Sequence, residues 1–312
     1  MNKVKKAIVL GGQTASGKSS LALCCCEHFG GEIISADSMQ VYRGMDIGTA
    51  KPDAEDMARV KHHLVNIMDI ERRFSSADFI KHAMHALEDI TSRGKIPFVT
   101  GGTGLYSEML FNSFSLAEGA GDEKVRNELW KKAEAGRGGE LYEQLEAVDP
   151  LAAAKTHPNN LKRVIRYLEI YLTAGKTPTE MNKINNSGDK IYEPLYICLY
   201  SEDRNYIYSR INERVEVMFE RGLIEEVSAL REKGLENTPT ASAAIGYKEL
   251  FPYFKGEISL EEAKDTINQH SRNYAKRQQS YFKRIKDVRF IDIKEKDYAD
   301  KAKAVIEKFL TE

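Results

Sequence analysis

The chain has 312 residues, of which 42% are hydrophobic and 30% are charged, and its formal net charge at pH 7 is −1. These values suit a globular protein of one large or two modest domains and give no overall electrostatic attraction toward nucleic acid. No apolar run is long enough to span a bilayer, and the basic N-terminus lacks a signal-peptide cleavage site, so we expect no membrane contact and a cytoplasmic location.

The first third of the chain alternates between predicted strands and helices. Ala7–Leu10 is a short apolar run that ends in glycines, which is typical of a buried parallel strand, and the sequence is helical from Leu21. Ser75 and Asp78 can cap a helix over residues 76–93. Further strands are predicted at residues 32–36, 64–68 (within 62–70) and 95–100. This alternation predicts an α/β fold with a phosphate-loop type of parallel sheet covered by helices on both faces.

The composition changes after about Asn112. Residues 122–173 are helical and charged, and a strand pattern returns at Leu195–Tyr200. We therefore predict an α/β core made of residues 1–112 and 195–312, interrupted by a mostly helical insertion domain at residues 113–194. The strand is followed by a long amphipathic helix with apolar residues at Ile207, Ile211, Val215, Met218 and Phe219.

The stretch Gly12-Gln-Thr-Ala-Ser-Gly-Lys-Ser19 has the spacing of a phosphate-binding loop and lies between a predicted strand and a predicted helix. Its glycines let backbone N–H groups approach phosphate oxygens, and the helix start adds a partial positive charge. Lys18 supplies a mobile cation, and the hydroxyl of Ser19 can bind Mg²⁺. A plain glycine turn with a surface lysine is the alternative. The predicted binding residues are Gly12, Gln13, Thr14, Ala15, Ser16, Gly17, Lys18 and Ser19.

Two more polar residues follow predicted strands, Asp37 and Thr103. Ligands of open parallel sheets bind at the carboxyl ends of the strands, so both side chains should face the phosphate site. Asp37 can hold Mg²⁺ or accept a proton there, although an aspartate in this position is often only a turn former. Arg210 and Arg214, four residues apart on the late helix, can neutralise a phosphate leaving group or form a solvated row paired with nearby glutamates.

Several blocks, collinear along the chain, resemble the tRNA dimethylallyltransferases. The most specific is ISADSMQVYRGMDIGTAKP at residues 34–52, which an ordinary kinase would not be expected to carry. The other blocks are the phosphate loop, Thr100–Tyr106, His157–Glu169, Ala244–Glu249 and Ala275–Gln278.

This resemblance implies an enzyme of the bacterial form that transfers a dimethylallyl group from dimethylallyl diphosphate to N6 of an adenosine in tRNA. The target is the adenosine just 3′ of the anticodon, at position 37, in tRNAs that read codons beginning with U. The phosphate loop would then hold Mg²⁺ and the diphosphate leaving group. The implied partner is the tRNA anticodon stem-loop, whose adenosine must flip out of its stack. Nothing in the sequence demands a dimer, and we expect a monomer.

The resemblance also implies roles for single residues. Asp37 matches the general base, Thr103 the threonine of the catalytic channel, and Arg214 the diphosphate-binding arginine, with Arg210 as the alternative. Two basic segments, 162–166 and 272–286, match tRNA-contacting regions, although a solvated helix face is the alternative for the first. The implied tRNA-binding residues are Asp37, Ser38, Met39, Gln40, Lys162, Arg163, Val164, Ile165, Arg166, Lys276, Arg277 and Gln278.

The departures from the family pattern are small. Gln13 stands where proline is usual, which predicts a slightly more flexible loop, and Ser280-Tyr281 replaces Thr-Trp. Three other functions are alternatives: a nucleotide kinase, a nucleotide-regulated RNA-binding protein without chemistry, and a prenyltransferase acting on free adenine nucleotides. The kinase would require an arginine-rich lid, and the basic insertion and the Ala-Lys-Arg-Gln tail favour a polynucleotide acceptor.

Overall fold

The structure is a computed structural model that describes residues 4–112, 122–186 and 191–312. The chain forms two compact units, one made of Met1–Glu108 with Ile191–Glu312 and the other of Met109–Lys190. The boundary expected at Ser113 lies outside the described residues. None of the helices in the described ranges is both long and apolar enough to cross a membrane.

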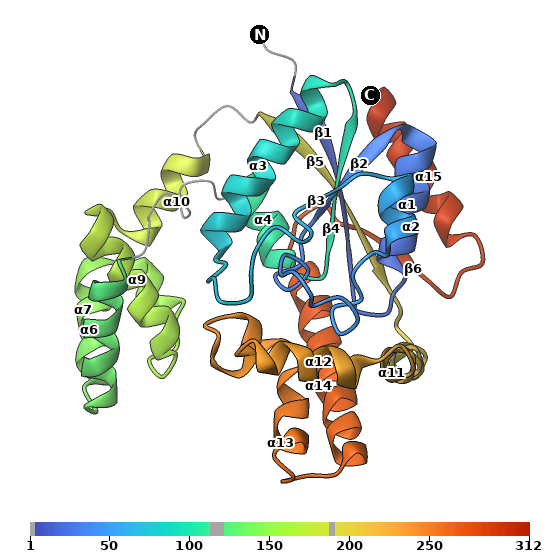
Figure 1. Ribbon diagram of the computed structural model, residues 1–312. Helices are drawn as coiled ribbons and strands as arrows, with labels where there is room; N and C mark the ends of the chain where they lie inside the picture. Colours follow the sequence, from blue (N-terminus) through green and yellow to red (C-terminus); the bar gives the residue numbers. More distant parts are fainter. Residues whose placement is uncertain (1–3, 113–121, 187–190) are drawn as a thin grey trace. The chain divides into compact units, whose positions relative to one another are not determined.

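The first unit contains a sheet in which every paired strand is parallel (Figure 1). In spatial order its strands are β3 (His62–His63), β2 (Gly31–Ser35), β4 (Ile96–Gly101), β1 (Lys5–Gly12), β5 (Tyr192–Tyr200) and β6 (Arg289–Asp292). The central strand β1 is buried from Ala7 onward, as its continuous apolar sequence predicts for a strand covered on both faces. The α/β prediction is confirmed.

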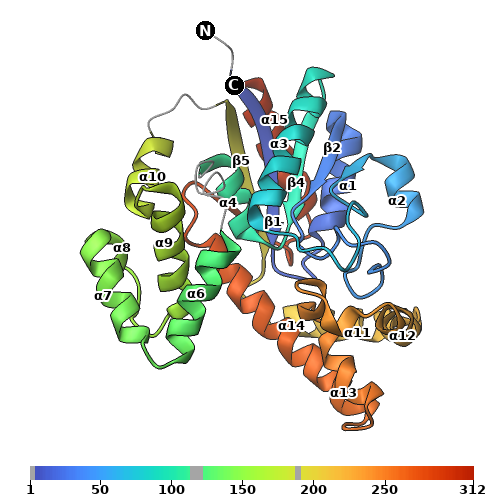
Figure 2. The ribbon, with the colours of Figure 1, turned by 60° about the vertical axis from the view of Figure 1, so that its left-hand side comes forward.

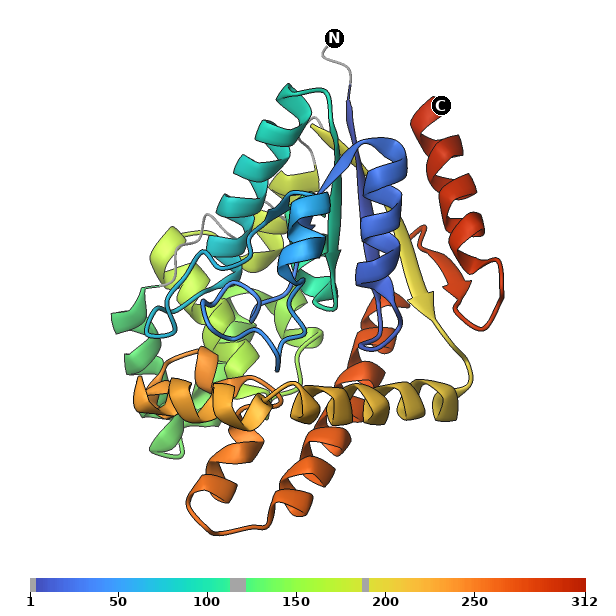
Figure 3. The same cartoon turned by 45° about the vertical axis from the view of Figure 1, so that its right-hand side comes forward.

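Helices cover both faces of this sheet (Figures 1 and 3). On one face, Ile8 and Leu10 of β1 share a core with α1 (Lys18–Phe29) and α15 (Tyr298–Thr311). On the other lies α3 (Ser76–Ser92), whose buried residues include Phe79 and Leu87. The predicted cap of α3 is present: Asp78 N–H donates to the Ser75 hydroxyl at 3.2 Å, and the Asp78 carboxylate accepts from Ser75 N–H at 2.9 Å.

Two parts of the sheet differ from the sequence prediction. The prediction of a strand within residues 64–68 is wrong, because β3 comprises only His62–His63. Leu64 and Asn66 have φ values of 63° and 56°, in the left-handed region, and so turn the chain out of the extended conformation. At the other edge, the apolar piece near residues 288–293 forms the sixth strand, β6.

Helices follow at the carboxyl edge of the sheet, where the view of Figure 3 shows α11 (Arg204–Glu220) below the strands. The predicted amphipathic face of α11 is buried at Ile207, Ile211, Val215 and Met218. The remaining helices of this unit are α2 (Ala54–Arg59), α12 (Leu223–Glu232), α13 (Phe251–Phe254), α14 (Leu260–Phe282) and the short turns Leu235–Asn237, Ala241–Ala243 and Lys248–Leu250. Helix α4 (Gly104–Asn112) leads out of it.

The second unit consists of helices joined by short turns, with no strand among its described residues (Figure 2). Its core includes Leu129, Leu145 and Leu168, and the buried carboxylate of Glu169 is paired with Arg126 at 2.7 Å and Arg166 at 3.0 Å. Pairing is what makes a fully buried carboxylate tolerable. Its helices are α6 (Glu123–Glu134), α7 (Gly138–Val148), α8 (Pro150–Ala154), α9 (Leu161–Ala174) and α10 (Pro178–Asn186).

Candidate active site

The phosphate loop joins β1 to α1 as the sequence predicts. Gly12 has φ 150°, and a Cβ there would overlap the carbonyl oxygen of Leu199, so the loop requires glycine at this position. Gln13, the departure from the family pattern, is buried, and its side-chain oxygen accepts from Ser201 N–H at 3.4 Å. The loop is therefore attached to the segment that follows β5, a contact that a proline could not make.

Lys18 and Arg214 form a partly buried positive site beside this loop. Burial, with a contribution from Arg214, lowers the pKa of Lys18 to about 8, while Asp37 acts in the opposite direction. Burial likewise lowers the pKa of Arg214, and Asp37 again opposes the shift. Two desolvated cations facing one carboxylate leave an excess of positive charge, which a bound anion would compensate.

Helix α11 supplies both candidate arginines to the loop. Arg214 Nη1 donates to the Thr14 hydroxyl at 3.1 Å, and Arg210 Nε donates to the carbonyl oxygen of Ala15 at 2.8 Å. Neither arginine forms an ion pair with a neighbouring glutamate within the described residues, so the alternative of a paired, solvated row does not describe them. Both side chains hold the loop while directing positive charge toward it.

Two cavities open around these residues. The phosphate-loop cavity, of about 450 Å³, is lined by Lys18 and Ser19 among others. The α11–α14 cavity, of about 300 Å³, is lined mainly by α11, α14 and residues 243–248. The residues that line both cavities are Thr14, Asp37, Thr49, Arg214 and Tyr274. These five residues therefore mark the place where the two cavities meet, and a group bound in one can react with a group bound in the other.

Asp37 follows β2 and stands at this junction. Its Oδ1 accepts from the backbone N–H groups of Met39 at 2.9 Å and Gln40 at 3.4 Å. Its Oδ2 accepts no hydrogen bond from any residue that the structure describes. Asp37 is therefore the turn former that the alternative expects, and its second oxygen is left able to accept a proton from a ligand.

Tyr274 and Gln278 of α14 complete the junction. Gln278 is buried and accepts from Thr14 N–H at 2.7 Å, while its amide donates to the carbonyl oxygen of Gly102 at 3.1 Å. Thr103 lines neither cavity. The pKa of the Tyr274 phenol is raised first by burial and then by Asp37, and the neighbouring Thr103 opposes this shift. Thr103 therefore lies beside Tyr274, next to the site rather than in its wall.

Several of the residues that the sequence predicts to contact RNA line one cavity or the other. Ser38 and Met39 line the α11–α14 cavity, as does Arg277, whose guanidinium lies 5.6 Å from the Tyr274 ring centre. Gln40 lines the phosphate-loop cavity and accepts from the Ser35 hydroxyl at 2.8 Å. Their contact with RNA, and that of the buried Gln278, stays a prediction.

The remaining basic residues are not among those that line the two cavities. Lys276 lies 5.9 Å from the Tyr208 ring centre and lines neither cavity. In the second unit, Lys162 and Arg163 are exposed, whereas Val164 and Ile165 are buried in the core of that unit. Only the exposed face of α9 can therefore meet a partner. The two apolar residues of this segment point inward.

Sequence reasoning missed the roles of Thr49 and Tyr274. Thr49 belongs to the block at residues 34–52, but nothing in its residue type indicates a cavity wall. Tyr274 is signalled more clearly, because Ile267, Ser271, Tyr274 and Gln278 recur at helical spacing and form one face of α14. Three of these four line the α11–α14 cavity, and that spacing could have predicted a shared direction.

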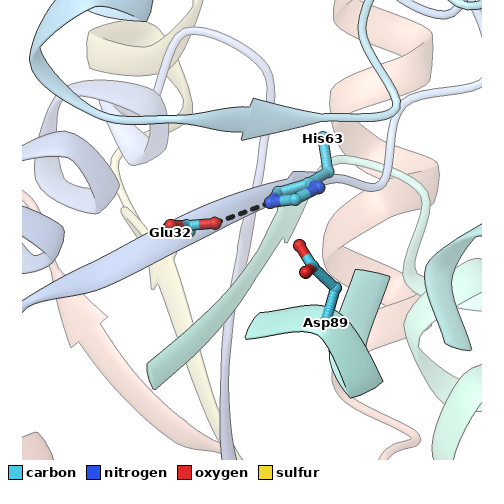
Figure 4. Close-up of side chains that lie close together, drawn as sticks. All are labelled: Glu32, His63 and Asp89. Carbon is cyan, nitrogen blue, oxygen red and sulfur yellow. Dashed lines mark hydrogen bonds and ion pairs between the residues drawn. The ribbon is translucent and has the colours of Figure 1, made fainter. Parts of the chain in front are cut away.

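Glu32, His63 and Asp89 come close enough together to suggest a metal site (Figure 4). The Glu32 carboxylate, however, is bound by Arg93 at 2.5 Å, Lys95 at 2.8 Å and His63 at 2.8 Å. Its pKa lies well below the usual range, chiefly because of the Arg93 hydrogen bond. A divalent cation would have to displace two cations, so we read this cluster, near the start of β2, as structural.

Comparisons with known proteins show which proteins this chain resembles. The sequence model of the IPP transferase family matches residues 40–285. A tRNA dimethylallyltransferase of Geobacter sulfurreducens is 43% identical over 287 residues, covering 92% of each chain. One from Halalkalibacterium halodurans is 42% identical and covers 95% of this chain and 94% of its own.

Solved structures extend the likeness to the fold. A tRNA isopentenylpyrophosphate transferase from Bacillus halodurans has a TM-score of 0.71 at 41% identity, covering 99% of this chain and 96% of its own. A eukaryotic dimethylallyltransferase acting on tRNA has a TM-score of 0.84 at 32% identity, covering 98% of this chain and 80% of its own.

Proposed function

Because this chain belongs to the IPP transferase family, we propose that its two cavities divide between the two substrates of a prenyl transfer to tRNA. The enzyme transfers a dimethylallyl group to tRNA. The diphosphate of the donor, dimethylallyl diphosphate, binds in the phosphate-loop cavity, and the acceptor base enters through the α11–α14 cavity. The observation that carries this proposal is that Asp37, Arg214 and Thr14 line both cavities.

The chemical step takes place at the shared wall. The acceptor is N6 of the adenosine 3′-adjacent to the anticodon, in tRNAs reading codons that begin with U. Its N6 attacks C1 of the dimethylallyl group, the C1–O bond breaks, and the electron pair leaves with the diphosphate. Asp37 Oδ2 accepts the proton that N6 loses. A neutral exocyclic amine is a weak nucleophile, so a carboxylate within hydrogen-bond reach is what this reaction needs.

The departing diphosphate gains negative charge as the bond breaks. Lys18 and Arg214 are placed to stabilise that charge, and their burial strengthens the interaction. Between the two candidate arginines, Arg214 is the better supported because it reaches the junction, whereas Arg210 lines the phosphate-loop cavity alone. Thr103 acts on the site through the neighbouring Tyr274.

Mg²⁺ belongs to the proposal as the ion that neutralises the diphosphate. The oxygens of Ser19, Asp37 and Glu213 line the phosphate-loop cavity, and oxygen ligands of this kind fit Mg²⁺. Ser19 would hold the ion. The proposal also includes a monomeric enzyme in the cytoplasm, with the anticodon stem-loop contacted by the exposed Lys162 and Arg163 and by Lys276 and Arg277.

The test is transfer of label from radioactive dimethylallyl diphosphate to an anticodon stem-loop carrying three adenosines 3′ of the anticodon, in the presence of Mg²⁺. AMP serves as the competing acceptor, and omission of Mg²⁺ as the metal control. We expect label in the stem-loop and none in AMP. Label in AMP alone would indicate a prenyltransferase of free nucleotides. If no label is transferred and ATP is consumed instead, the phosphate loop belongs to a kinase.

A further inference from the structure

A single carboxylate outside both cavities holds one wall of the site. Glu226 of α12 accepts hydrogen bonds from three consecutive backbone N–H groups, those of Asp46 at 3.0 Å, Ile47 at 2.8 Å and Gly48 at 3.1 Å. It also accepts one from the Tyr247 hydroxyl at 2.6 Å. Four donors from two distant segments thus converge on one side chain.

Tyr247 joins this contact to a second segment that lines the same cavity. Its side chain is fully buried, and its ring lies so close to Gly48 that a Cβ there would overlap it. The residues just before it, 243–246, line the α11–α14 cavity, as do Gly48 and Thr49. Glu226 therefore connects two parts of the cavity wall, residues 48–49 and residues 243–246, which are far apart in sequence.

The loop is also fixed from within. The buried Lys51 ammonium donates to the carbonyl oxygen of Tyr42 at 2.7 Å, to Asn66 Oδ1 at 2.7 Å, and to Asp46 Oδ1 at 2.5 Å. Lys51 thereby closes the far end of the turn that begins at Asp46. Glu226 supplies what this internal network lacks, which is a connection from the turn to the helical part of the unit.

We propose that Glu226 is a positioning residue, which sets Gly48 and Thr49 in the wall that receives the acceptor base. This inference rests on the proposed function. Glu226 lines neither cavity and so acts through the loop rather than on a substrate. Because Thr49 stands at the junction with Asp37, a shift of the loop would displace the base relative to the allylic carbon, and reactions of this kind are sensitive to small displacements.

The chemistry of the contact makes the inference testable by one isosteric change. A carboxylate has two oxygens that only accept, and here both face donors. In Glu226→Gln, the amide group would direct an N–H toward a backbone N–H or toward the Tyr247 hydroxyl. Size and packing are kept while at least one contact with a backbone N–H becomes repulsive, so a role in packing alone predicts no loss.

The experiment compares Glu226→Gln with Glu225→Gln, a matched change at the neighbouring exposed glutamate of the same helix. Hydrogen–deuterium exchange is followed in the peptide containing residues 46–48, and label transfer gives kcat and KM for the stem-loop. Calorimetry gives the Kd for inorganic diphosphate with Mg²⁺. We expect faster exchange at 46–48, and kcat/KM for the stem-loop lower by about 10- to 100-fold. The diphosphate Kd should stay unchanged, and Glu225→Gln should behave as the parent protein.

Two outcomes would overturn the inference. One is a Glu226→Gln variant whose hydrogen–deuterium exchange at residues 46–48 and whose kcat/KM for the stem-loop both equal those of the parent protein. The other is a loss of diphosphate binding equal to the loss of transfer, which would indicate general unfolding. Tyr247→Phe keeps the three backbone contacts and should give a smaller loss in the same direction. Failure of the parent protein to label the stem-loop would instead count against the proposed function, while the exchange measurement would still test the contact itself.

Discussion

The two cavities are built in different ways. The phosphate-loop cavity draws its charge from one contiguous motif, with Lys18 and Ser19 at the start of α1, and from arginines of α11. The α11–α14 cavity is assembled from separate stretches of the chain, and much of its wall is apolar, with Ile211, Val215 and Ile267 among its residues. Anion binding can thus be encoded locally by backbone geometry, whereas the second cavity exists only once distant segments are packed together.

The largest effect should come from the junction itself. Asp37→Asn keeps the size of the side chain and an oxygen for the turn contacts with Met39 and Gln40, but removes the proton acceptor. We expect label transfer to the stem-loop to fall by about 10²- to 10⁴-fold. Binding of inorganic diphosphate should persist, because the amide keeps the loop in place. Transfer at the parental rate would show that Asp37 is not the base.

How far the sequence could predict the site follows from this contrast. The phosphate loop, Asp37 and the alternation of strands and helices along the chain are local patterns. Each of them depends on residues that are close together in sequence. Tyr274, Thr49 and Glu226 depend on segments that are far apart in sequence, so no local pattern indicates their meeting. The misplaced β3 has the opposite cause: the apolar pattern at residues 64–68 is real, but positive φ values at Leu64 and Asn66 prevent a strand there.

The next effect distinguishes the two arginines of α11. Arg214→Ala should lower kcat by about 10²- to 10³-fold, since it removes a cation placed where the leaving group gains charge. Arg210→Ala loses the contact with Ala15 and a cation of one cavity only, so it should mainly weaken diphosphate binding. Parallel kcat and Kd measurements on the two variants test this, and a larger fall in kcat for Arg210→Ala would reverse the assignment.

The partly buried ammonium of Lys18 predicts a pH dependence of donor binding. In the free protein its pKa is lowered to about 8, mainly by burial, and the negative charge of a bound diphosphate would raise it again. Binding therefore takes up a proton, and affinity should fall as pH rises through about 8, by at most about tenfold per pH unit. Calorimetry of inorganic diphosphate from pH 7 to 9 checks this. The side chain in Lys18→Arg stays protonated, so this part of the pH dependence of affinity should vanish. If affinity depends on pH equally in both proteins, the dependence comes from the ligand.

The smallest effect concerns the two basic residues of α14. Arg277 lines the α11–α14 cavity, whereas Lys276 packs over Tyr208 on another side of the helix. If each contacts one phosphate, each alanine variant should reduce the slope of log affinity against log salt by about one. Arg277→Ala should also raise KM for the stem-loop, and Lys276→Ala should leave it closer to the parental value. Equal effects of the two variants on KM would contradict the placement of Arg277 at the acceptor cavity.

The most direct test of the division between the cavities uses Ser271, which lines the α11–α14 cavity alone and is partly exposed. Ser271→Trp places a large side chain in that cavity without touching the phosphate loop. The measurement is the Kd for inorganic diphosphate with Mg²⁺, alongside single-turnover transfer to the stem-loop. We predict an unchanged Kd and transfer reduced by at least about tenfold, as expected when an acceptor can no longer be positioned. Parental transfer, or transfer and diphosphate binding lost together, would contradict the assignment of the two cavities to two substrates.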